Sequence, residues 1–123
     1  MTPLRVLVVE PDALLRALVS EWLEHEGIHA VFPPPGPFEA SAELGRIEAV
    51  VVDIPSPPHA EHVLRAWRRA FPNAELIAAS ASFPAGIEAD DAMAGRLAVA
   101  KVLAKPFSRR QLFAALGVQG RDR

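Results

Sequence analysis

Short apolar runs that alternate with helix-like segments constrain the fold of this chain more than any other feature of its sequence. Residues 4–10 and 49–54 are almost unbroken runs of Val, Leu, Ile and Ala, and each carries an acid at or next to its end. Such runs are typical of strands that are buried on both faces of a parallel sheet. Similar, shorter runs occupy residues 28–32, 76–80 and 101–105, so we expect five strands.

Helical patterns separate these runs. In residues 12–26, apolar side chains recur at the spacing of one helix face, and Asp12 favours the positive start of that helix. Ser108 and Gln111 form the pattern of a capping box for a last helix that ends at Gly117. Weaker helical patterns cover residues 38–44, 59–71 and 87–97. Each predicted strand is therefore followed by a predicted helix.

Five strands that alternate with five helices predict right-handed βαβ units and a parallel sheet covered on both faces. In such sheets, ligands bind beyond the carboxyl ends of the strands, at the point where the strand order reverses. Four of the predicted strands end at polar residues, namely Glu10, Asp53, Ser80 and Lys105. We therefore expect two acids, a hydroxyl and a lysine to converge on one edge of the sheet, which we call the carboxyl edge.

The size and charge of the chain narrow the classes of protein to which it can belong. Its 123 residues suit one domain, which we place at residues 3–117, with a flexible tail at 118–123. A net charge of −2 lacks the excess of positive charge that is typical of proteins binding nucleic acid or an anionic membrane. The absence of cysteine excludes disulfides, thiol catalysis and Cys-ligated zinc. No apolar run approaches the roughly 18 residues of a membrane span and no signal-peptide pattern is present, so we expect a soluble cytoplasmic protein.

The residue types at the carboxyl edge suit phosphoryl transfer. Asp53 could attack phosphorus to form an acyl phosphate, as aspartates do in covalent phosphoryl enzymes. Lys105 would neutralise one phosphoryl oxygen, and Ser80 would donate a hydrogen bond to another. The acids would hold Mg²⁺, which prefers one or two carboxylates together with phosphate and water.

Four short motifs at this edge resemble those of the receiver domains of bacterial two-component response regulators. Residues 6–10 resemble the first strand of the family with its acidic end, and residues 51–57 resemble its phosphoacceptor strand. Residues 79–81 resemble the Ser/Thr–Ala strand end, and residues 105–107 resemble the Lys-Pro-Phe motif. The resemblance runs end to end. It implies a flavodoxin-like (βα)5 three-layer α/β sandwich with strand order 2-1-3-4-5 and a second helix that is short or irregular.

The resemblance also implies a function. Asp53 would be the phosphoacceptor, assisted by Lys105 and Ser80, and Glu10 with Asp53 would bind Mg²⁺. The phosphoryl donor would be a histidine kinase or a histidine phosphotransfer protein, so the chain would be no enzyme beyond transfer onto itself. As a stand-alone receiver it would signal by contact with a downstream protein partner or relay the phosphoryl group. The resemblance also implies that the chain could form a homodimer.

Two positions depart from the family pattern. The family usually has two adjacent acids after the first strand, and the second binds Mg²⁺ directly, whereas this chain has Pro11 there. Asp12 could replace that ligand or only stabilise the start of the first helix, and Glu10 could be an acid tolerated at the rim. Val102 stands at the switch position, where the family commonly has Tyr or Phe. We therefore expect phosphorylation to be slow and to use Mg²⁺ inefficiently.

Two other functions fit parts of the pattern. A pseudo-receiver would keep the fold and bind a partner without phosphorylation, with Asp53 and Lys105 as a structural ion pair. A hydrolase with an aspartate nucleophile would need a general acid two residues later, where this chain has Pro55. Within either function, Ser80 could serve only as a turn former.

Two groups of side chains, a pair of histidines and a set of three arginines, are expected to lie on solvated helix faces. His59 and His62 lie one helical turn apart, but no further ligands are nearby, so we expect a solvated face rather than a metal site. A solvated helix face is also expected for Arg65, Arg68 and Arg69, with docking to a partner as the alternative.

Overall fold

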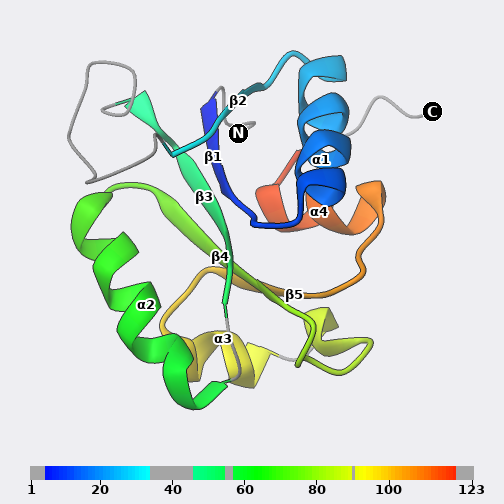
Figure 1. Cartoon of the computed structure of the whole chain (residues 1–123). Helices are drawn as coiled ribbons and strands as arrows, with labels where there is room; N and C mark the ends of the chain where they lie inside the picture. The colour runs from blue at the N-terminus through cyan, green and yellow to red at the C-terminus, as the bar shows by residue number, and fades with distance from the viewer. Residues whose placement is uncertain (1–4, 34–45, 55–56, 90, 119–123) are drawn as a thin grey trace.

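The computed structural model describes residues 5–33, 46–54, 57–89 and 91–118. Five parallel strands form one sheet in the order β2-β1-β3-β4-β5, as the resemblance implies (Figure 1). Their bounds are Arg5–Val9 for β1, His29–Val31 for β2, Ala49–Asp53 for β3, Glu75–Ser80 for β4 and Lys101–Ala104 for β5. All five expected strands are present, with small differences at their ends.

Helices connect these strands. The α-helices in the described part of the chain are α1 (Ala13–His25), α2 (Pro57–Ala70), α3 (Asp91–Leu97) and α4 (Arg109–Leu116), and η2 (Ile87–Ala89) is a 3-10 helix. The first, third and last predicted helices are confirmed as α1, α2 and α4. The helix expected at residues 38–44 lies outside the described residues. Among the residues that the structure describes, no helix is long and apolar enough to cross a membrane.

The helix expected over residues 87–97 is confirmed at Asp91–Leu97 (α3), but it is wrong at Ile87–Ala89, which form the separate 3-10 helix η2. Its apolar spacing fits either arrangement, since Ile87 and Leu97 are buried in the same cluster. A long-range contact accompanies the division. Glu88, in η2, reaches β5, and its Oε2 accepts a hydrogen bond from the N–H of Ala104 at 3.0 Å.

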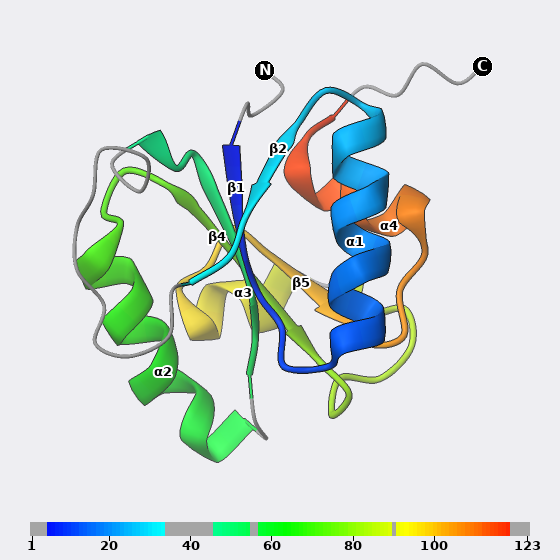
Figure 2. The same ribbon diagram turned by 45° about the horizontal axis from the view of Figure 1, so that its top comes forward.

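The sheet separates two apolar clusters, each covered by two helices (Figures 1 and 2). The helices α1 and α4 cover one face, which we call the α1/α4 face, and α2 and α3 cover the other, the α2/α3 face. Successive strand residues point to opposite faces. In β3, Val51 joins the α1/α4 cluster, whereas Val50 and Val52 join the other. Leu23 of α1 and Leu64 of α2 are fully buried, so both helices are anchored in these clusters.

On the α1/α4 face, side chains close in sequence satisfy the helix ends. Ser108 and Gln111 form the predicted capping box of α4, and Gly117 ends the helix in a left-handed conformation at φ 74°. The N–H of Val118 then donates to the carbonyl oxygen of Phe113 at 2.9 Å, and its side chain packs against the cluster. A flexible tail that starts at residue 118 is therefore wrong for Val118, whereas residues 119–123 lie outside the described part.

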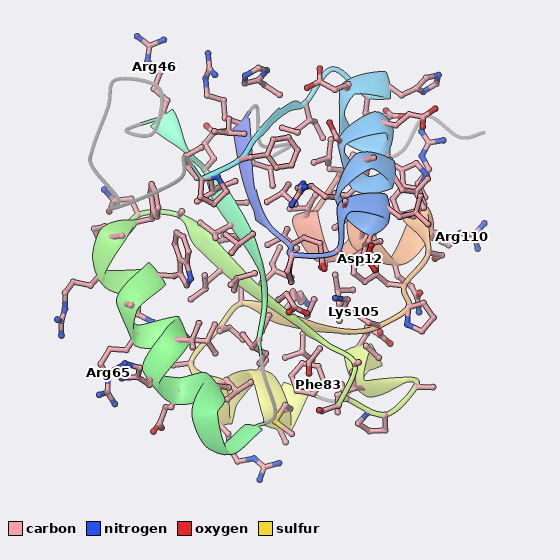
Figure 3. The ribbon with its side chains drawn as sticks, in the orientation of Figure 1. Asp12, Arg46, Arg65, Phe83, Lys105 and Arg110 are labelled. Carbon is pink, nitrogen blue, oxygen red and sulfur yellow. The ribbon has the colours of Figure 1, made fainter. Side chains whose placement is uncertain are left out.

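On the α2/α3 face, a distant side chain satisfies a helix end. The Nη2 group of Arg68 donates to the carbonyl oxygen of Leu97, the last residue of α3, at 3.0 Å and to that of Ala98 at 2.8 Å. The last carbonyls of a helix lack partners within the helix, so they accept this guanidinium. The prediction of a solvated face is therefore wrong for Arg68. It is confirmed for Arg65 and Arg69, which are exposed, and Arg65 points away from the molecule in Figure 3.

Candidate functional site

The strand register brings the predicted polar residues to one edge. Val9 of β1 pairs with Val52 of β3, so Glu10, which follows β1, lies beside the end of β3 at Asp53. Asp53 in turn pairs with Ala79 of β4. Because parallel strands end at the same edge of a sheet, these side chains gather at the carboxyl edge.

Lys105 lies between the two carboxylates. Its Nζ is 2.8 Å from Asp53 Oδ1 and 2.9 Å and 3.1 Å from Glu10 Oε1 and Oε2. All three side chains are largely buried, with exposed fractions of 7% for Glu10, 16% for Lys105 and 25% for Asp53. We call them the Glu10–Lys105–Asp53 triad. Figure 3 shows Lys105 at this edge, below the start of α1.

Backbone groups hold the members of the triad in place. Glu10 Oε2 also accepts a hydrogen bond from the N–H of Asp12 at 3.0 Å, and the Glu10 carbonyl accepts one from Arg16 Nη1 at 3.0 Å. The N–H of Lys105 donates to the carbonyl oxygen of Ser80 at 3.0 Å. Glu10 and Lys105 are therefore fixed at their backbones as well as by their ion pairs.

The surroundings of Lys105 change its pKa in opposing ways. Burial lowers the pKa of Lys105, because it disfavours the charged amine. The hydrogen bonds and negative charges of Asp53 and Glu10 raise it by more, so the pKa of Lys105 is raised above its ordinary value of 10.5. Lys105 is therefore a full positive charge at neutral pH.

Asp12 caps α1, as one of its two interpretations predicted. Its Oδ1 accepts hydrogen bonds from the N–H groups of Leu14 at 2.9 Å and Leu15 at 3.3 Å. These N–H groups lie in the first turn, where no helical carbonyl is available to them. The carboxylate of Asp12 therefore binds the helix, while its backbone N–H binds Glu10.

Ser80 and Val102 lie deeper than the triad. Ser80 is only 1% exposed, and its Oγ accepts a hydrogen bond from the N–H of Ser82 at 3.0 Å, which is the arrangement of a turn former. Its backbone contacts Lys105, as described above. Val102 is buried in the α2/α3 cluster, so the residue at the switch position is part of the core.

The residues present do not fit a ready Mg²⁺ site. Mg²⁺ demands near-ideal octahedral coordination by oxygen and usually uses one or two carboxylates with several waters. The described residues contain no group of three or more His, Asp or Glu side chains placed to hold a metal ion. Glu10 and Asp53 are the two acids at the edge, and the ammonium of Lys105 contacts both. Of the predicted histidine pair, His62 is exposed, and the side chain of His59 lies outside the described part.

The sequence patterns missed two contributors to this edge, Arg16 and Glu88. Arg16 donates to the carbonyl oxygen of Glu10 from a position six residues later in the chain. No sequence motif marks an arginine at this spacing as a partner of the strand end. Glu88 binds the backbone of Ala104, immediately before Lys105, across sixteen positions of sequence. No local pattern encodes such a contact.

Comparisons with known proteins identify the fold. No protein-family model and no curated protein matches the sequence. Among solved structures, a response regulator from Thermotoga maritima is 20% identical, with a TM-score of 0.67 over 95% of this chain and 96% of that one. An orphan response regulator of H. pylori is 19% identical, with a TM-score of 0.64 over 93% of each chain. The T. maritima response regulator TrrA, solved in complex with Mg²⁺-BeF, is 22% identical, with a TM-score of 0.61 over 92% and 96%. The chain therefore has the fold of response regulator receiver domains.

Proposed function

We propose that this chain is a receiver that accepts a phosphoryl group on Asp53 and signals by contact with another protein. The position of Asp53 carries the proposal. Its side chain ends β3 at the carboxyl edge, is a quarter exposed, and has one oxygen, Oδ1, 2.8 Å from Lys105 Nζ. In the described part of the chain, its second oxygen makes no hydrogen bond, so it is available to an incoming group.

The chemistry follows from that position. A carboxylate oxygen of Asp53 attacks the phosphorus of a phosphohistidine, the P–N bond breaks with its electron pair passing to the imidazole nitrogen, and an acyl phosphate forms. Lys105 neutralises negative charge on the transferring group, at the cost of its contacts with the carboxylates. The chain itself would then catalyse only transfer onto its own side chain.

The partners follow from the same proposal. The donor would be a histidine kinase or a histidine phosphotransfer protein in the cytoplasm, and the output would be contact with a downstream protein or with a second copy. The neighbour TrrA was solved with Mg²⁺-BeF, which supports Mg²⁺ as the family's ion. Here Pro11 supplies no ligand, so we expect only weak use of Mg²⁺.

The direct test is incubation with acetyl phosphate, followed by measurement of intact mass. We expect a gain of one phosphoryl group by the wild type and none by Asp53→Asn. The series should run from chelated metal to saturating Mg²⁺, with circular dichroism confirming that both proteins are folded. A wild-type protein that gains no phosphoryl mass at any Mg²⁺ concentration would overturn the proposal.

A second candidate is a phosphorylation-independent receiver that binds its partner constitutively. The observation in its favour is that the carboxylate of Asp12 caps the start of α1. The described part of the site is therefore left without a third acid that could bind a metal ion. Under this candidate, beryllofluoride with Mg²⁺ leaves the amide spectrum of the wild type unchanged. Shifts around Asp53 would contradict it and favour the phosphoacceptor.

A further inference from the structure

We infer that the ammonium of Lys105 is the resident cation of the carboxyl edge and excludes divalent metal ions from it. The inference concerns the same site as the proposed function, and it rests on that function for the choice of Mg²⁺ as the competing ion. It adds a regulatory property, namely that Lys105 must leave the carboxylates before a metal ion can bind.

The ammonium of Lys105 has no spare hydrogen-bond donor. A lysine ammonium has three N–H donors. Three carboxylate oxygens lie within 3.1 Å of Lys105 Nζ, at 2.8, 2.9 and 3.1 Å, two from Glu10 and one from Asp53. The donors of Lys105 are therefore fully used by the two acids, and any new ligand of this ammonium replaces an existing contact.

Most carboxylate oxygens that a metal ion would need at this edge already contact Lys105. Both oxygens of Glu10 contact Lys105, and Oε2 also accepts the N–H of Asp12 at 3.0 Å. Asp53 Oδ1 contacts Lys105 as well. A metal ion that approached either carboxylate would face a positive charge about 3 Å beyond it in a largely buried site, where charges interact strongly. One oxygen, Asp53 Oδ2, is left as a ligand in the described part.

Pro11 and Asp12 do not supply replacement ligands. Pro11 has no side-chain oxygen, and the carboxylate of Asp12 accepts two N–H groups of α1. Recruiting Asp12 to a metal ion would remove the cap of the helix and move the N–H that braces Glu10. The arrangement around Lys105 is therefore stabilised by the same residues that would have to supply a metal site.

The test is a Mg²⁺ titration followed by NMR on the full chain. The sequence contains only two lysines, Lys101 and Lys105, so their side-chain signals can be separated and Lys101→Arg assigns them. Lys101 is exposed at the start of β5 and serves as the internal control. We expect the Lys105 signal to stay in place at millimolar Mg²⁺. A saturable shift of Lys105, with no shift of Lys101, would overturn the inference.

A variant tests the same point in the opposite direction. Lys105→Gln removes the charge and leaves Glu10 and Asp53 facing each other. We expect Mg²⁺ to bind this variant at least about tenfold more tightly than the wild type, whereas Lys101→Gln should bind as the wild type does. Equal affinities for wild type and Lys105→Gln would count against the inference. If Lys105→Gln does not fold, the wild-type lysine signals decide the question alone.

The two proposals fail in different ways. Phosphorylation of Asp53 that needs Mg²⁺, accompanied by displacement of Lys105 by Mg²⁺ alone, would retain the proposed function and overturn this inference. The opposite result is also possible: Mg²⁺ leaves the Lys105 NMR signal unchanged, and the protein gains no phosphoryl mass. That result would retain the inference and overturn the proposed function.

Discussion

The two faces of the sheet end their helices in different ways. On the α1/α4 face, the caps come from residues within a few positions of each helix end, such as Asp12 and Ser108. On the α2/α3 face, the end of α3 depends on Arg68, which lies in α2, 29 positions before Leu97. Asp12 and Ser108 therefore cap their helices locally, whereas the last carbonyl of α3 accepts a donor from another helix. Contacts between helices are not confined to the second face, since Arg109 Nη2 of α4 lies 2.7 Å from Glu26 Oε2 at the end of α1.

A helix as short as α3 gains stability from a contact with another element. The helix α3 has only seven residues, and helices this short are not stable by themselves in water. A guanidinium presents several donors in a rigid fork and can bind two carbonyl oxygens at once. Arg68 therefore joins two elements at the place where α3 has carbonyls without helical partners.

Large-to-small changes in the two clusters test whether the faces unfold separately. Leu23 and Leu64 are both fully buried, one on each face, so replacement of either by Ala should lower the free energy of unfolding by about 2–5 kcal/mol. Trp22 packs on the α1/α4 face and Trp67 on the α2/α3 face, so urea unfolding can be followed on each through Trp22→Phe and Trp67→Phe backgrounds.

We expect the two tryptophans to report one transition in both variants, because every central strand contributes to both clusters. An earlier transition at Trp67 in Leu64→Ala would show instead that the α2/α3 face unfolds on its own. The wild-type protein in each single-tryptophan background is the control.

Removal of the long-range cap should have the next largest effect. Arg68→Ala leaves the Leu97 and Ala98 carbonyls without their charged donor, and we expect a loss of about 1.5–3 kcal/mol in the free energy of unfolding. Arg69→Ala, an exposed neighbour, should change stability by no more than about 0.5 kcal/mol. Equal effects of the two changes in urea denaturation would remove the distinction between the faces.

Removal of a local cap should cost less and remain confined. Ser108→Ala removes the acceptor for the N–H of Gln111, and we expect a loss of about 1 kcal/mol. Amide hydrogen exchange should accelerate in the first turn of α4 and leave α3 unchanged. Acceleration that spread to α3 would mean that the capping of the α1/α4 face is not local.

The last prediction concerns the pH dependence of stability that Lys105 contributes, which is flat near neutral pH and changes only in alkali. Since the pKa of Lys105 is raised in the folded protein, its ion pairs contribute fully below pH 10.5 and are lost as pH rises through the raised pKa. The difference in unfolding free energy between the wild type and Lys105→Gln should therefore be constant from neutral pH to pH 10.5 and shrink above it. A difference that grows in alkali would have the wrong sign.

Local and periodic signals account for what the sequence predicted. The strands, their order and the meeting of Asp53 with Lys105 followed from apolar runs with polar ends and from the resemblance. The caps at Asp12 and Ser108 followed from neighbouring residues. Arg68 and the division of residues 87–97 were mispredicted, because both depend on contacts with chain segments that are far apart in sequence. For Glu10, the position was predictable, but its pairing with Lys105 required the three-dimensional arrangement.

The contact of Glu88 with β5 also limits how copies of this chain can associate. An edge strand with unpaired N–H groups can add a strand from another molecule. The N–H of Lys105 points toward β4, so that of Ala104, one residue earlier, points outward, where Glu88 binds it at 3.0 Å. The carboxylate thus occupies the outward N–H at the end of β5, so a strand from another molecule could pair there only by displacing Glu88.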